Sequence, residues 1–302
     1  MSGLRKVWLG VVVLAFAGLA AAVALRHSNF AVLNSAGPVG SQERHLLIII
    51  TLLGLLVIVP VFGLLFGFAW HYREGNAKAA YSPELDGSRI AETIWWLIPM
   101  IIIGIVSVLT WNSSHSLDPY KTLASTGKPL QVQVVALEWK WLFIYPEQHV
   151  ASVNALYIPE KTPVNFQITA DAPMNSFWIP QLGGQVYAMA GMNTQLHLMA
   201  DKTGDFKGSS ANLSGEGFAD MRFTAHAKTA DEFTSWVKNT RHSATPLTLG
   251  EYATLALPSK QAAPRNYSNP DSKLYDTILM KYMMPNMNDG MGMSNTDMGE
   301  MR

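Results

Sequence analysis

The sequence contains no cysteine among its 302 residues. Cysteine is needed for a disulfide scaffold, for thiolate ligation of copper or an iron–sulfur cluster, for covalent haem attachment, and for a thioether-linked lipid at the N-terminus. The absence excludes all four features from this chain. It becomes informative only if the rest of the sequence is built to hold such a site.

Charged residues are also scarce. They make up 15% of the chain, against about 25% in a typical soluble protein, and the formal net charge is zero. Hydrophobic residues reach 49%, and they are concentrated in the first part of the chain. The sequence has no basic patch interleaved with aromatic residues, so nucleic acid is not expected as a partner.

The first of three long apolar stretches covers residues 7–25 and follows Arg5 and Lys6. A short basic region before an apolar run is typical of a secretory signal peptide, and small residues near the end of the run supply cleavage positions. We therefore predict a signal-peptide-like segment over residues 1–27. The alternative is an uncleaved first membrane helix.

Two further stretches, about residues 46–69 and 93–111, carry no charged side chain. Each is long enough to cross a hydrocarbon core of about 30 Å at 1.5 Å per residue. They predict a two-helix transmembrane hairpin within residues 28–112. The segment between them, 71–90, contains Lys and Arg, whereas residues 111–120 contain neither. The positive-inside rule therefore places this segment in the cytoplasm and the chain after the hairpin outside it.

Short apolar–polar alternations follow the hairpin. Residues 130–135 have the period of two and the β-branched content that are typical of a strand, and similar runs occur at 165–169, 195–199 and 222–225. Many short strands without helices between them favour a β-sandwich or a barrel. We predict an all-β extracytoplasmic domain over residues 113–227.

The pattern then becomes helical. Thr229 can cap a helix whose first turn holds Asp231 and Glu232. A further helix is expected to begin near Asp271. Together they predict a helical C-terminal arm over residues 228–282.

The last twenty residues, 283–302, contain seven methionines among glycine, asparagine and aspartate. Copper(I) favours thioether sulfur, so one interpretation is a loose copper site. The other, which we predict, is a solvated and disordered tail, because no Met-x-x-Met or Met–His array repeats regularly. The eight histidines of the chain are also scattered, and none has a metal-binding spacing such as i, i+4.

Three segments together indicate a family. They read AETIWWLIP at residues 91–99, EWKWLFIYP at 138–146 and MNSFWIPQLG at 174–183. Their order and spacing resemble subunit II of the haem–copper oxidases over roughly residues 40–225. The resemblance implies a membrane α-helical hairpin plus an all-β cupredoxin-like extracytoplasmic domain with a C-terminal helical arm.

The missing cysteines acquire positions from this resemblance. The resemblance implies that this subunit holds a binuclear copper centre in the cytochrome c oxidases. The ligands of that centre are a histidine just before Ser-Trp-x-x-Pro and a loop with the pattern Cys-x-Glu-x-Cys-x-x-x-His-x-x-Met. The corresponding residues here are Asn175 and, along the loop, Ser210, Asn212, Ser214, Phe218 and Met221. Serine hydroxyls and a phenyl ring cannot replace thiolates and imidazole as copper ligands. We therefore predict that the copper site is lost and that this chain binds no metal.

Loss of the copper centre with retention of the fold resembles the quinol-oxidising branch, the cytochrome bo- or ba-type ubiquinol oxidases. The resemblance implies a complex that passes electrons from ubiquinol to O2 and translocates protons. Haems, copper and ubiquinol then belong to subunit I, and this chain is a redox-inactive scaffold. The expected partners are subunit I, further small membrane subunits and membrane lipid, in a bacterial inner membrane with the large domain in the periplasm.

The resemblance also raises the question of a lipid anchor. Many relatives in this branch are lipoproteins with a cysteine directly after the signal segment. Here Ser28 stands near the corresponding position. A hydroxyl cannot accept the thioether-linked lipid, so no lipid anchor is expected.

Glu92 is the candidate functional residue of the hairpin. A carboxylate at the cytoplasmic end of an apolar helix is costly to bury and often belongs to a proton path. Its alternative role is a charge that complements the helix macrodipole. The resemblance favours the functional role, and the hypothesis is that Glu92 helps to form a proton-uptake entrance shared with subunit I.

Trp139 and Trp141 are candidate interface residues. In copper-containing relatives, the position of Trp139 lies between the copper centre and subunit I. Without copper, we expect Trp139 to pack at the subunit interface. Trp141, with Phe143 and Tyr145, fits either a barrel core or a membrane-facing surface. Lys140 is expected to face water or a partner carboxylate.

One alternative stays open from the residues. A membrane-anchored periplasmic copper carrier would use the cupredoxin fold and the Met-rich tail, and copper retained in stoichiometric amount would favour it. A cytochrome c oxidase subunit with degenerate copper ligands is not expected, because it would lack a site at which to accept electrons.

Overall fold

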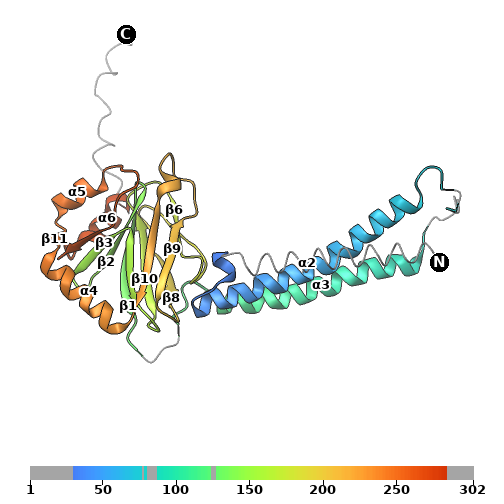
Figure 1. Cartoon of the computed structure of the whole chain (residues 1–302), viewed down its shortest axis with the longest axis horizontal. Helices are drawn as coiled ribbons and strands as arrows, with labels where there is room; N and C mark the ends of the chain where they lie inside the picture. The colour runs from blue at the N-terminus through green and yellow to red at the C-terminus, as the bar shows by residue number, and fades with distance from the viewer. Residues whose placement is uncertain (1–29, 77, 80–86, 124–126, 284–302) are drawn as a thin grey trace, which may run out of the picture. The chain divides into compact units, whose positions relative to one another are not determined.

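The computed structural model describes residues 30–76, 78–79, 87–123 and 127–283. They form two compact units, which Figure 1 shows. The hairpin unit comprises residues 42–121, and the β unit comprises the described residues of 1–41 and 122–302. The signal-like segment, Ser28 and all of the Met-rich tail except Met283 lie outside the described residues.

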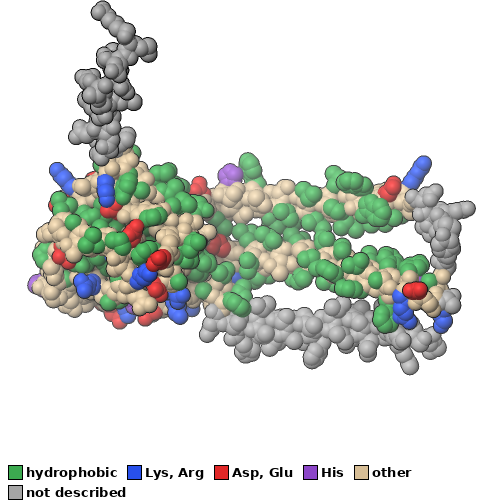
Figure 2. Space-filling view, turned by 90° about the horizontal axis from the view of Figure 1, so that it is seen from above, with side chains coloured by type: hydrophobic (Ala, Val, Ile, Leu, Met, Phe, Trp, Pro, Cys, Tyr) green, Lys and Arg blue, Asp and Glu red, His purple; other side chains and the backbone are tan. Residues whose placement is uncertain are grey.

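Two long helices, α2 (Pro38–His71) and α3 (Arg89–Ser116), dominate the hairpin unit. Both are long and apolar enough to cross a membrane, and each contains one of the predicted spans. Their surfaces carry large apolar side chains along most of the length, which Figure 2 shows in green. Leu56 is 62% exposed and Trp96 is 71% exposed. Helices without a polar face require apolar surroundings, so these two helices are suited to a lipid environment.

The β unit is built on twelve strands in two sheets. Their bounds are β1 (Leu130–Leu137), β2 (Lys140–Tyr145), β3 (Val150–Val153), β4 (Ala155–Pro159), β5 (Val164–Ala170), β6 (Asn175–Trp178), β7 (Val186–Ala188), β8 (Thr194–Leu198), β9 (Gly204–Ser210), β10 (Arg222–Lys228), β11 (Thr245–Pro246) and β12 (Arg265–Ser268). The seven-stranded sheet has the order β11-β12-β3-β2-β1-β5-β8, and the five-stranded sheet has the order β4-β10-β9-β6-β7. The four predicted strands are confirmed as β1, β5, β8 and β10.

The sequence of β2 shows how both faces of the seven-stranded sheet are used. Trp141, Phe143 and Tyr145 belong to the core between the sheets, whereas Leu142 and Ile144 belong to a second cluster on the opposite face. All five side chains are at most 3% exposed. A strand that is covered on both faces carries a continuous apolar run in place of an alternating one.

Most of the arm covers the second face of this sheet (Figure 1), whereas Phe233 and Val237 of its first helix belong to the core between the sheets. Its helices are α4 (Ala230–Ser243), α5 (Leu249–Ala256) and α6 (Leu274–Met283); two short 3-10 helices lie elsewhere, η1 (Ala31–Leu33) and η2 (Phe218–Asp220). The predicted cap is confirmed, because Thr229 and Glu232 form a reciprocal capping box at the start of α4. The arm is not wholly helical, however. β11 and β12 extend the sheet beyond β3, and strands this short give little periodicity in the sequence.

Candidate functional site

The residues that correspond to copper ligands, according to the resemblance, lie at one end of the five-stranded sheet. β6 begins at Asn175 and β9 ends at Ser210, and these two antiparallel strands are neighbours. The loop of residues 211–217, then η2 and Met221, follow β9 directly. Sheet pairing therefore brings Asn175 next to the loop, although 35 residues separate it from Ser210.

Ser210 is the centre of a hydrogen-bond network. Its Oγ lies 2.9 Å from Asn175 Oδ1 and 3.2 Å from Asn212 O, so its single proton is donated to one of these oxygens. The same Oγ accepts from the backbone N–H groups of Ser176 and Asn212, each at 3.4 Å. Asn175 is 1% exposed and Ser210 is 5% exposed. The polar atoms at this position are therefore satisfied by each other inside the protein.

The remaining donor atoms do not form a copper site either. Asn175 Nδ2 donates to Pro173 O at 2.7 Å, which commits the amide nitrogen as a donor. Met221 is fully buried in the hydrophobic core cluster. The Ser214 Oγ is buried and makes no hydrogen bond within the described residues, but a neutral hydroxyl is a poor ligand for copper.

The donor chemistry at the strand end therefore does not fit a binuclear copper centre. Amide, hydroxyl and phenyl groups stand where the centre needs thiolates and imidazoles. Over the part of the chain that the structure describes, no group of three or more His, Asp or Glu side chains is placed to hold a metal ion.

Trp139 packs on the same loop. Its Nε1 donates to Ser214 O at 3.2 Å. A Cβ atom on Gly217 would lie 2.3 Å from the Trp139 indole ring, so a residue without a side chain is required at this contact. The Trp139 side chain is half-buried, and Leu213 of the same loop is 77% exposed.

A segment of the arm, residues 257–262, lies at the same end, and we call it the arm strap. Lys260 Nζ pairs with Glu216 Oε2 at 2.8 Å and lies 5.8 Å from the centroid of the Trp139 ring. The hydrogen bond from Lys260 holds the pKa of Glu216 below its usual value. Sequence reasoning did not find the arm strap, because no local pattern connects it with a loop more than forty residues away.

The structure corrects the interface hypothesis for Trp141. Its side chain is 0% exposed, and its ring makes T-shaped contacts with Phe177 at 5.4 Å and Phe223 at 5.8 Å between centroids. A ring with no exposed surface cannot contribute to a subunit interface. The barrel-core alternative is the one observed.

The expectation for Lys140 is also wrong. The residue is 2% exposed, and its ammonium group donates to Leu257 O at 2.6 Å and to Ser259 Oγ at 2.5 Å in the arm strap. Alternation along β2 places Lys140 on the face opposite Trp141. That face was expected to meet water, but the arm covers it.

Glu92 lies in the first turn of α3. Ser88 caps this helix, since its Oγ accepts from the Ala91 N–H at 3.4 Å. The Glu92 side chain is exposed in this chain. This placement is compatible with the macrodipole role and equally with a proton-uptake role that involves a partner subunit.

A buried carboxylate connects the arm to the sandwich. Asp171 follows β5 and accepts from Tyr252 OH, Lys281 Nζ and Tyr282 OH, each at 2.6 Å. We call these four residues the arm clasp. Burial by itself raises the pKa of Asp171, but the three hydrogen bonds outweigh it and lower the pKa below the usual value. No local pattern indicated this cluster, because Asp171 lies 81 residues from Tyr252 and 110 residues from Lys281 in the chain.

Comparisons with known proteins agree with this architecture. The family profile described as cytochrome C oxidase subunit II, periplasmic domain, matches residues 147–227, and the COX aromatic rich motif matches residues 241–286. The first match, the two-sheet sandwich and the two apolar helices confirm the predicted fold class. They also fit a protein of the inner membrane.

Several curated relatives are similar over most of the chain. The cytochrome bo(3) ubiquinol oxidase subunit 2 of Pseudomonas aeruginosa is 47% identical over 87% of this chain and 80% of its own length. The ubiquinol oxidase subunit 2 of Acetobacter aceti is 44% identical over 92% of this chain and 90% of its own length. The quinol oxidase subunit 2 of Bacillus subtilis is 39% identical over 85% of this chain and 78% of its own length. These relatives do not favour the copper-carrier alternative.

Proposed function

The chain belongs to the ubiquinol oxidase subunit 2 family, and from this premise we propose that it serves a complex passing electrons from ubiquinol to O2 as a redox-inactive subunit. The observation that carries the proposal is the hydrogen bond of 2.9 Å between Ser210 and Asn175, at positions where copper ligands would stand. Satisfied neutral groups cannot accept an electron. A donor that delivers electrons elsewhere in the complex, such as a membrane quinol, needs no copper centre on this chain.

The haems, the copper and the ubiquinol site are assigned by this proposal to subunit I. The hairpin supports a position beside such a subunit, because its large apolar side chains are exposed in the isolated chain and need lipid or partner helices around them. Further small membrane subunits and lipid complete the surroundings. The proposal places the protein in the bacterial inner membrane as a multi-pass protein, with the β unit in the periplasm.

Co-purification tests the proposal as a whole. An affinity tag on this chain, used after extraction of membranes in a mild detergent, is expected to recover a haem-bearing subunit together with ubiquinol oxidase activity. Metal analysis should assign the copper of the complex to the partner subunit. Isolation of the chain alone, or stoichiometric copper bound to the isolated chain, would contradict the proposal.

Glu92 is proposed to form part of a proton-uptake entrance of the complex. Support comes from its position in the first turn of α3 and its exposed side chain. Glu92→Gln removes the titratable proton but keeps the size of the side chain, so we expect several-fold slower oxygen consumption by the assembled oxidase. Glu74→Gln, an exposed carboxylate of the segment between the helices, is the matched control and should leave turnover unchanged. Normal turnover and proton pumping in Glu92→Gln would exclude this role.

Trp139 and its loop are proposed to face subunit I. The support is an accessible apolar surface, formed by the half-buried Trp139 ring and by Leu213, which is 77% exposed. Leu213→Asp would place a charge in this contact without disturbing the core, so it should lower the recovery of subunit I in the tagged preparation. Leu249→Asp, at a leucine of the arm that is 50% exposed, is the control. Equal recovery with both variants would argue against the interface.

A further inference from the structure

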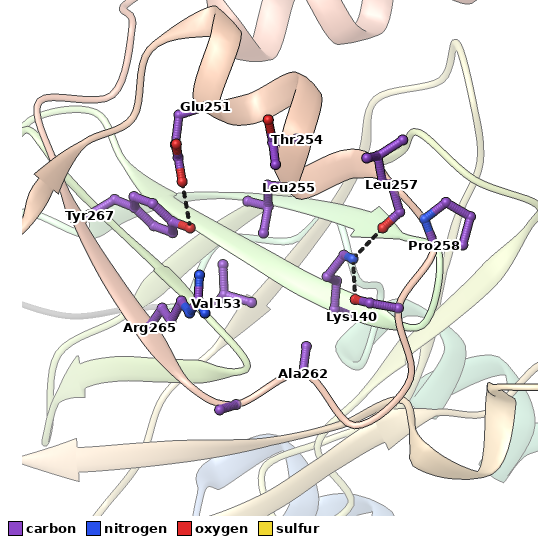
Figure 3. A pocket seen from close by; sticks show the side chains of 12 residues that line it. Lys140, Val153, Glu251, Thr254, Leu255, Leu257, Pro258, Ala262, Arg265 and Tyr267 are labelled. Carbon is purple, nitrogen blue, oxygen red and sulfur yellow. Dashed lines mark hydrogen bonds between the residues drawn. The ribbon is translucent and has the colours of Figure 1, made fainter.

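A cavity of about 300 Å³ lies where α5 and the arm strap cover β2, β3 and β12 of the seven-stranded sheet, and Figure 3 shows its lining. β2, β3, α5, the arm strap and β12 all contribute residues to its wall. The volume is at the lower end of the range found for sites of small molecules, about 300–1,000 Å³. Its chemical character differs from that of the copper-ligand positions, because two cationic side chains, Lys140 and Arg265, line the cavity.

Lys140 supplies a buried positive charge to this wall. Its ammonium group has three N–H donors, of which Leu257 O and Ser259 Oγ take two. Both acceptors are neutral, so neither compensates the charge. Burial lowers the pKa of Lys140, and the charge of nearby Glu138 raises it by less. A buried cation with a spare donor favours an anionic partner.

A second cation and a single carboxylate complete the charges of the lining. Arg265, from β12, is exposed and borders the same space as Lys140 (Figure 3). Glu251 is the one acidic residue among the residues that line the cavity, and its Oε1 accepts from Tyr267 OH at 3.4 Å. With both cations protonated, the lining has an excess of one positive charge.

The rest of the lining is largely apolar. Val153, Leu255, Pro258 and Ala262 contribute aliphatic surface between and around the charged groups. An inorganic anion would use the cations but leave this surface against water. A ligand with an anionic head and a short hydrocarbon body would satisfy both parts of the cavity.

We propose that this cavity binds a small monocarboxylate with a short alkyl chain. Its carboxylate would accept hydrogen bonds from Lys140 Nζ and from the Arg265 guanidinium group, and its alkyl part would lie against Val153 and Leu255. The proposal goes beyond quinol oxidation and does not depend on it. Binding is measured on the chain itself, so this proposal and the proposed function succeed or fail separately.

The test is a calorimetric titration in which butyrate, the probe, is added to the full chain in detergent. Butyrate is expected to bind with a Kd of about 1 mM or lower. Affinity should rise about fourfold per methylene from acetate to butyrate, because each buried methylene adds apolar contact. Butyramide, which has the same shape without the charge, should bind at least about tenfold more weakly. Equal binding of butyramide, no binding of butyrate, or tighter binding of inorganic phosphate would overturn the proposal.

Two variants locate the site without unfolding the protein. Arg265→Gln, at an exposed residue, is expected to weaken butyrate binding about tenfold, whereas Arg241→Gln, at an exposed arginine of α4, should leave it unchanged. Glu251→Gln removes the repulsive carboxylate and should tighten binding, an effect that loss of stability cannot produce. Unchanged affinity in both Arg265→Gln and Glu251→Gln would place the butyrate elsewhere and overturn the proposal.

Discussion

The hairpin unit and the β unit place tryptophan in opposite surroundings. Trp95 and Trp96 of α3 are 62% and 71% exposed, whereas Trp141 of β2 is 0% exposed. A large ring is stabilised by leaving water in both cases. In the β unit the chain's own two sheets supply the apolar environment, but in the hairpin unit lipid or another subunit must supply it. The β unit therefore carries its own folding free energy, and the hairpin depends on its surroundings.

The sharpest test of this comparison is truncation of one tryptophan from each unit. Trp141→Ala should lower the free energy of unfolding of the β unit by about 3–5 kcal/mol, because it leaves a cavity beside the stacked rings of Phe177 and Phe223. Trp96→Ala should change it by less than about 0.5 kcal/mol, since Trp96 is 71% exposed in this chain and has little packing to lose. Denaturant unfolding of the full chain in detergent, followed by circular dichroism, measures both. Equal losses would remove the distinction between the units.

The arm clasp tests whether the arm is part of the self-sufficient β unit. Asp171→Asn removes the charge that accepts hydrogen bonds from Tyr252, Lys281 and Tyr282. We expect a loss of about 2 kcal/mol, as for buried hydrogen bonds to a charged group. Hydrogen exchange should show faster opening of α6 than of β2. Asp276→Asn, at an exposed carboxylate of α6, is the control and should leave the exchange of α6 as it is.

The same cluster predicts a dependence of arm docking on pH. The pKa of Asp171 is lowered in the folded state, so its contribution is present above the unfolded pKa of about 3.9 and is lost as the pH falls through the lowered value. The pKa of Lys281 is raised, chiefly by the hydrogen bond to Asp171, so its contribution is present below the unfolded value and is lost as the pH rises through the raised one. The protection of α6 against exchange, relative to the intrinsic exchange rate at each pH, should therefore be highest at intermediate pH and lower at both extremes. Asp171→Asn should abolish the acid limb, and an unchanged acid limb in this variant would exclude Asp171 as its source.

Sequence reasoning succeeded where short-range patterns decide the structure. The apolar runs of α2 and α3, the alternation in β1 and the cap at Thr229 depend on neighbours within a few residues. The contacts that determine the arm do not. Lys140 binds an acceptor 117 residues away, and Lys281 binds Asp171 across 110 residues. The burial of Lys140 and the arm strap therefore had no local signal.

The copper-ligand positions fall between these cases. The resemblance identified Asn175 and Ser210, but it gave no indication that they bind each other. Their pairing follows from the antiparallel contact of β6 with β9. A sequence pattern can therefore name a lost site without predicting which interactions replace it.

The smallest expected effect concerns this replacement. Ser210→Ala removes the hydroxyl that bonds to Asn175 and accepts from two backbone N–H groups. The expected loss in the free energy of unfolding is about 1 kcal/mol, the usual net value of a neutral hydrogen bond with partial desolvation of its partner. Ser209→Ala, at the half-buried neighbour in β9, is the matched control. Ubiquinol-dependent oxygen consumption by the complex should be the same in both variants, because the loop carries no redox group. If Ser210→Ala slowed oxygen consumption without lowering stability, the strand end would have a direct part in the reaction, and the β unit could no longer be described as a scaffold alone.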